Sequence, residues 1–146
     1  EPALERFHAL FRGEPLALDK WFALQAGAPE RGGATFGRVR ALLAHPDYTP
    51  TNPNRVRSLL HMYCLHNAAA LHRADGAGVR LWADRVLELD ARNPQLAARL
   101  ARALDRWRQL AEPYRAQARQ AIERVAAHPQ LSNDVREVVT RALEAS

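Results

Sequence analysis

The chain has 146 residues, 47% of them hydrophobic, so it can bury a sizeable core, and we expect one domain over residues 1–146. Its formal net charge is +5 and Lys20 is its one lysine, which permits contact with nucleic acid or with acidic groups but does not choose between them. The single cysteine, Cys64, excludes an internal disulfide framework and favours a cytoplasmic setting, and no apolar run approaches the roughly 18 residues of a membrane span.

The elements predicted along the chain are all helices. Helix starts are expected near residues 2, 15, 33, 52, 77, 93, 112 and 132, and most of the following segments carry apolar residues three and four positions apart. No segment alternates apolar and polar residues for long enough to be a strand, so the predicted fold class is all-α. The clearest apolar stripes are Val56, Leu59, Leu60 and Tyr63; Val79, Trp82, Val86 and Leu89; Leu96, Leu100, Leu104 and Trp107; and Val135, Val139 and Leu143.

The breaks between these helices recur at a regular spacing. Asn52-Pro53 and Asn93-Pro94 each read as an N-cap followed by a first helical residue, and they lie 41 residues apart. A repeat of about 40 residues is typical of HEAT and armadillo helix pairs. The sequence therefore predicts an α-solenoid of antiparallel helix pairs, a HEAT/armadillo-like superhelix with about eight or nine helices, and a compact helical bundle is the alternative.

The sequence contains no recognisable catalytic motif. None of the six histidines belongs to an H-E-x-x-H pair, and no glycine-rich phosphate loop is present. The donors of His61, Cys64 and His66 are close in sequence, but ordinary packing is the simpler interpretation. Ser132 reads as a helix cap before Asp134. We expect no catalytic residue, no metal ligand and no cofactor in this chain.

The arginines are the remaining candidates for a site. Arg99, Arg102 and Arg106 are spaced to share one helix face, which is either a solvated face with ion pairs or a surface that meets an anion. Arg55 lies in the first turn of a helix, where the helix dipole disfavours a cation. Farther along the chain, Arg80, Asp84 and Glu88 are spaced by four residues and read as simple surface pairing.

Four stretches carry a family resemblance. They are LDKWFALQ at 18–25, RVRALLAHPDYTPTNPNRVRSLL at 38–60, ELDARNPQLAAR at 88–99 and LSNDVREVVTRAL at 131–143. Together and in this order they resemble the C-terminal end of bacterial aminopeptidase N, a family of zinc-dependent alanyl aminopeptidases of the gluzincin type. The resemblance covers nearly the whole chain and identifies it as the last part of a helical terminal domain.

The resemblance implies a function that the residues alone do not. In that family the helical domain closes over the active site and controls which peptides enter, while the zinc ion is held by a catalytic domain that precedes it. This chain would then be a piece of a longer aminopeptidase, a hydrolase and metalloprotease, without the catalytic domain and without activity alone. Its partners would be that domain and the C-terminal portion of a peptide substrate, and the family positions that match Arg55 and Arg99 face the cavity.

Two alternatives stay open. Arg55 either offers its charge to a carboxylate in that cavity, in which case Arg55→Ala should leave the stability of the chain almost unchanged, or pairs with a carboxylate inside this domain. The chain as a whole could instead be a free-standing α-solenoid adaptor that binds a protein or RNA through its arginine-rich face, although the resemblance argues against nucleic acid and against a membrane as partners.

We also expect self-association of the isolated chain. An apolar flank at its start should be exposed and should drive two copies together. The residues of this flank are Leu4, Phe7, Leu10, Phe11, Trp21 and Phe22.

Overall fold

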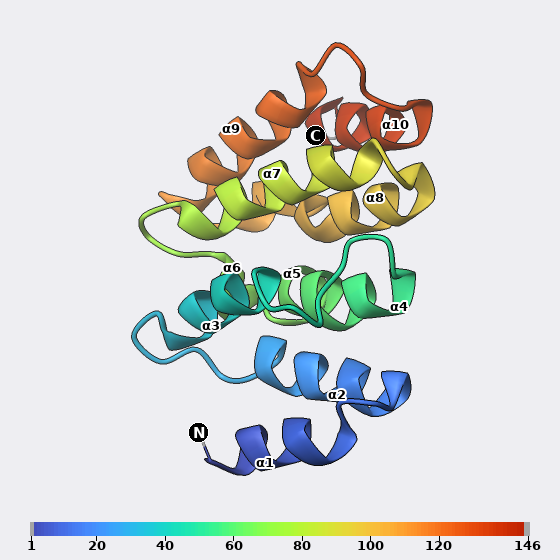
Figure 1. Cartoon of the computed structure of the whole chain (residues 1–146). Coiled ribbons are helices and arrows are strands. Elements are labelled where there is room, and N and C mark those ends of the chain that lie inside the picture. Colours follow the sequence, from blue (N-terminus) through green and yellow to red (C-terminus); the bar gives the residue numbers. More distant parts are fainter. Residues whose placement is uncertain (1, 145–146) are drawn as a thin grey trace. The chain divides into compact units, whose positions relative to one another are not determined.

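The computed structural model describes residues 2–144, except for the side chain of Phe11, and these residues form helices without any strand (Figure 1). With the continuous stretch from Pro53 to His66 taken as one, the described residues form nine α-helices, so the predicted fold class and helix number are confirmed. The chain divides into two compact units, residues 1–70 and 71–146. Each unit is described by itself.

The first unit is built around its second helix. Its elements are α1 (Pro2–Phe11), α2 (Pro15–Ala26), α3 (Ala34–Leu43), α4 (Pro53–Val56), the π-helical segment η1 (Arg57–His61), α5 (Met62–His66) and most of α6 (Ala68–Leu71). Helix α2 packs against α1, α3, α4, η1 and α5. Its buried face carries Trp21 and Phe22, and Phe22 has no exposed surface. Asn67 donates hydrogen bonds from Nδ2 to the carbonyls of Ala26 and Ala28, at 2.8 and 2.9 Å, and so closes the end of α2.

The helix that starts at Pro53 follows the predicted apolar stripe. Asn52 Oδ1 accepts a hydrogen bond from the backbone N–H of Arg55 at 3.2 Å, which confirms the predicted cap. Residues 57–61 form a π-helical stretch inside an otherwise continuous helix. All four residues of the stripe are nevertheless buried: Val56, Leu59, Leu60 and Tyr63.

The second unit consists of two helix pairs. Its elements are α7 (Ala77–Asp90), α8 (Pro94–Ala101), the 3₁₀ segments η2 (Arg102–Leu104) and η3 (Trp107–Gln109), α9 (Tyr114–Ala126) and α10 (Asn133–Glu144). Helices α7 and α8 form one pair and α9 and α10 the other, with α7 packed on α9 and α8 on α10 (Figure 1). Pairs stacked in this way bury the apolar stripes of both, as an armadillo-type repeat requires.

The glycines at residues 76 and 78 fix the entry into α7. Gly76 precedes the helix with φ of 73°, a left-handed conformation that glycine adopts without strain. The carboxylate of Asp75 accepts a hydrogen bond from the N–H of Ala77 at 2.9 Å. A Cβ atom at position 78 would lie 1.9 Å from the carbonyl oxygen of Leu71. Close backbone packing therefore requires glycine there.

The three tryptophans tie helices together in the same way. Each indole is buried, and its Nε1–H donates to a backbone carbonyl of another element. Trp21 donates to Leu4 at 2.8 Å, Trp82 to Leu100 at 2.9 Å and Trp107 to Ala142 at 3.0 Å. A buried N–H needs such a partner, and here each bond also fixes the distance between two helices.

The structure modifies two expectations. The helix expected to run to Trp107 ends at Ala101 and continues as separate 3₁₀ turns, although its leucine stripe is buried as predicted. The expected exposed flank is wrong for Trp21 and Phe22, which lie in the core of the first unit.

The rest of that flank is mixed. Leu10 is 76% exposed, and Leu4 and Phe7 are partly buried. The Phe11 side chain lies outside the described residues. Self-association stays a prediction.

Candidate functional site

Arg55 lies inside the first unit with its charge already paired. Only 5% of the residue is exposed, and its Nε donates to Asp19 Oδ1 at 2.7 Å. Its Nη1 donates to the carbonyl oxygen of Asp47, and the guanidinium lies over the ring of Phe22, 5.1 Å from the centroid. These contacts explain how an arginine can occupy the first turn of α4, because the carboxylate of α2 offsets the unfavourable helix dipole.

This arrangement bears on the two interpretations of Arg55. The ion pair with Asp19 is the internal partner that one interpretation requires. A cation this buried offers little surface to a substrate. A position facing a substrate cavity stays a prediction for Arg55, and its contacts in this chain favour a supporting role.

Arg99 lies on an open surface in the second unit. A groove of about 560 Å³ runs between α8, η2 and α10, and Arg99 and Arg102 both line it. Arg106 does not, because the helix ends before it and the expected arginine face is divided. The charged residues of the groove are Arg99, Arg102, Asp105, Asp134, Glu137 and Arg141.

The charges of the groove are only partly paired. Arg141 Nη2 lies 2.7 Å from Glu137 Oε1, whereas Arg99 and Arg102 make no ion pair with any residue that the structure describes. Neither Asp105 nor Glu112 forms an ion pair with these two arginines; the carboxylate of Glu112 lies 3.5 Å from Arg115 Nη2 instead. Two guanidinium groups thus remain available to an anion, and arginine binds a carboxylate with two parallel hydrogen bonds.

Asp105 is a residue of the groove whose carboxyl has a shifted pKa. Partial burial raises the pKa of its carboxyl above the ordinary value, while the positive charges of Arg102 and Arg141 act in the opposite direction.

The metal-donor residues that are close in sequence do not form a cluster. His61 and Cys64 are buried, His66 is exposed, and burial raises the pKa of the Cys64 thiol far above its ordinary range. Among the described residues the group that could hold a metal is instead His8, His45 and Asp47. The spacing of residues in the sequence does not predict this group, because His8 is distant from the other two along the chain.

The described helices carry no membrane signal. None of them combines the length and the apolar character of a segment that crosses a bilayer.

Three bacterial proteins named aminopeptidase N match nearly the whole chain in sequence. Aminopeptidase N of Caulobacter vibrioides is 46% identical over 143 residues, which is 98% of this chain and 16% of that protein. Aminopeptidase N of Haemophilus influenzae is 35% identical over 97% of this chain, and that of Escherichia coli is 38% identical over 88%. The chain spans 14 to 16% of the length of these relatives.

A solved structure agrees with this result. The crystal structure of Legionella pneumophila aminopeptidase A in complex with aspartic acid superposes with a TM-score of 0.88 at 30% identity, over 97% of this chain and 16% of that one. A family model described as a domain of unknown function (DUF3458_C) with ARM repeats matches residues 1–144. The resemblance to the C-terminal helical domain of bacterial aminopeptidase N is confirmed, and the chain belongs to the DUF3458_C family of ARM-repeat domains.

Proposed function

We propose that this chain is the non-catalytic helical portion of a metallo-aminopeptidase, an enzyme that removes N-terminal amino acids from peptides. In this role it closes the active-site cavity and controls substrate access. Similarity to aminopeptidase N over 98% of the chain but 16% of the relative supports the proposal. The catalytic zinc ion of such an enzyme does not fit this chain, because no histidine here belongs to an H-E-x-x-H pair. The catalytic domain of the same longer protein would hold it.

The groove in the second unit is the part of the chain that we propose faces the substrate. The observation that carries this proposal is that two arginines of the groove, Arg99 and Arg102, have no ion-pair partner among the described residues. Together they can bind the C-terminal carboxylate of a peptide whose N-terminal end lies at the zinc. Arg99 is the principal contact, since it is exposed at the end of α8.

Arg55 has a different part in the proposal. It fixes the first turn of α4 to α2 through Asp19 and to the preceding loop through Asp47. In this way it maintains the shape of the first unit, whichever surface of that unit meets the rest of the enzyme. A reducing, cytoplasmic location is proposed as well, and the unpaired buried thiol of Cys64 supports it.

The test compares two kinds of substrate in the longer enzyme that contains this chain. Arg99→Ala should raise KM for peptides with a free C-terminal carboxylate about tenfold, the loss expected for one charge-assisted hydrogen bond. Alanyl anilides, which lack that carboxylate, should keep their KM. If the arginine binds the ground state and the transition state equally, kcat should not change.

The matched control is Arg106→Ala, which removes an exposed arginine that does not line the groove. It should leave both substrates unaffected. Equal effects of Arg99→Ala on peptides and anilides would contradict the substrate contact. Binding of RNA by the isolated chain, lost on Arg99→Ala, would favour the adaptor interpretation instead.

A further inference from the structure

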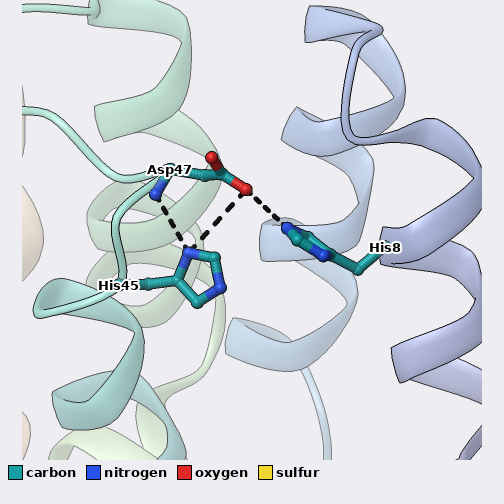
Figure 2. Close-up of side chains that lie close together, drawn as sticks. All are labelled: His8, His45 and Asp47. Carbon is teal, nitrogen blue, oxygen red and sulfur yellow. Dashed lines mark hydrogen bonds and ion pairs between the residues drawn. The ribbon is translucent and has the colours of Figure 1, made fainter.

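Two histidines and an aspartate from separate parts of the first unit converge at its surface. His8 comes from α1, and His45 and Asp47 come from the loop that follows α3 (Figure 2). His8 Nε2 lies 2.5 Å from Asp47 Oδ2, and His45 Nδ1 lies 3.9 Å from the same oxygen. One donor atom of each residue lies within 4.8 Å of the other two.

The surroundings hold both imidazole rings in place. The ring of Trp21 lies 4.7 Å from the His8 ring and 5.2 Å from the His45 ring, measured between centroids. The two imidazoles are 5.1 Å apart and nearly perpendicular. Because Trp21 is buried and bonded to Leu4, the rings rest on a fixed support and little side-chain entropy remains to be lost when they bind a ligand.

The hydrogen bond to His45 leaves its Nδ1 without a proton, as a metal ligand requires. The backbone N–H of Asp47 donates to His45 Nδ1 at 3.0 Å, so this nitrogen carries a lone pair that faces Asp47, and a metal ion bound at Nδ1 replaces this hydrogen bond. Neutral imidazole is the form that binds a metal ion.

We propose that His8, His45 and Asp47 form a binding site for a divalent transition-metal ion, with Zn²⁺ as the expected ion. The ligand atoms are His8 Nε2, His45 Nδ1 and a carboxylate oxygen of Asp47. Two imidazoles and a carboxylate are a donor set that zinc accepts, and a partner from solvent completes a tetrahedral shell. Binding replaces the hydrogen bond between His8 and Asp47: His8 with its ring proton on Nδ1 offers the Nε2 lone pair to the metal, and a carboxylate oxygen of Asp47 becomes a second ligand.

The distances require only small movements. Ligands at about 2.0–2.1 Å from a tetrahedral zinc ion lie about 3.4 Å from one another. The pair His8–Asp47 is closer than this, at 2.5 Å, and the pair His45–Asp47 is farther apart, at 3.9 Å. Changes of about 1 Å in side-chain position bring both pairs to the required separation, and the loop that carries Asp47 can supply them.

Access and charge also permit a cation. The three side chains are 24%, 25% and 33% exposed in the order His8, His45, Asp47, so an ion and a water molecule can reach them from solvent. The positive charge of Arg55 is nearby, at the carbonyl of Asp47, but it is paired with Asp19 at 2.7 Å. The carboxylate of Asp47 therefore stays available to the metal.

A metal ion here would join α1 to the loop after α3. The ligands at residues 8 and 45 enclose most of the first unit, so the ion would act as a cross-link that stabilises the folded state. The site's effect on stability can thus be measured without any enzymatic activity.

The test is titration of the chain, prepared without an affinity tag, with ZnCl₂ in a calorimeter. We expect one ion per chain with a dissociation constant below about 100 µM. His8→Ala and His45→Ala should each weaken binding at least about tenfold, since each removes a ligand. Saturating zinc should raise the thermal midpoint of the wild-type chain by about 3 °C or more, and a chelator should reverse the shift.

The matched control is His66→Ala, because His66 is an exposed histidine of the same unit outside the cluster. It should bind zinc like the wild type. Metal-free melts show whether the variants fold, and the visible spectrum of bound Co²⁺ reports tetrahedral coordination separately from stability. No binding by the folded wild-type chain, or equal binding by all variants, would overturn the proposal.

Discussion

Arg55 Nε lies 2.7 Å from Asp19 Oδ1, and the two side chains are only 6% and 14% exposed. The pair joins α4 to α2 across 36 residues of sequence. Removing Arg55 should cost more stability than the attraction between the two charges contributes. The Asp19 carboxylate would then be unpaired in a position with little access to water.

Arg55→Ala should therefore destabilise the chain by about 2–4 kcal/mol, the cost of leaving one member of a mostly buried ion pair without its partner. This reverses the expectation from the sequence that the change would be almost neutral. Urea denaturation followed by circular dichroism measures the difference. Arg57→Ala, which removes an exposed arginine bonded to Asn54, is the control and should have little effect. A neutral Arg55→Ala would show that the ion pair does not form.

Asp90 and Ser132 give a second test, in the second unit. The Asp90 carboxylate is 7% exposed and accepts hydrogen bonds from Ser132 N at 2.8 Å and from Ser132 Oγ at 2.5 Å. Asp90→Ala should cost about 2–3 kcal/mol, because the N–H and O–H at the start of α10 lose a charged acceptor. Asp84→Ala removes an exposed aspartate of the same helix and should change the thermal midpoint little. Similar losses in the two variants would argue against a special role of Asp90.

Two helical glycines should respond in opposite directions to alanine. Gly78→Ala places a Cβ against the Leu71 carbonyl and should destabilise the chain by about 3 kcal/mol or more. Gly37→Ala meets nothing within 4 Å in α3 and should stabilise it by about 0.5–1 kcal/mol. The measurement is the thermal midpoint of each variant beside the wild type. A change of the same sign in both variants would refute the packing argument.

His72 predicts how stability depends on pH. Burial lowers the pKa of its imidazole below the ordinary value of 6.5, so the folded state keeps it neutral while the unfolded chain takes up a proton. Stability should fall as pH decreases below 6.5 toward the lower folded pKa. His72→Leu should reduce this loss between about pH 7 and pH 5, whereas His66→Leu, at an exposed position, should keep the wild-type slope. If stability changed with pH equally in all three chains, His72 would not be the cause of the loss at low pH.

The local features of the fold were predictable from sequence. Asn52, Asn93 and Ser132 cap helices as expected, because a capping side chain bonds to an N–H only three residues away. The apolar stripes were also predictable, since their spacing follows directly from the helical period.

The pairing of charges was not predictable in the same way. The expected ladder of Arg80, Asp84 and Glu88 is wrong: Asp84 pairs with Arg124 of α9, and Glu88 pairs with Arg85 at 3.1 Å. Long side chains choose among several neighbours, and only the packed helices determine which of them is near. The same limit applied to Asp19, whose partner Arg55 is distant in sequence, and to His8, which is distant from His45 and Asp47.

The placement of the three buried indoles gives the chain its own optical reporters. Trp21 is the one tryptophan of residues 1–70, and Trp82 and Trp107 both belong to residues 71–146. A Trp21→Phe chain should fluoresce from the second unit, and a chain with Phe at positions 82 and 107 from the first. Emission from such a pair of variants, followed through a denaturant titration, would reveal whether the two units lose their structure together or in sequence.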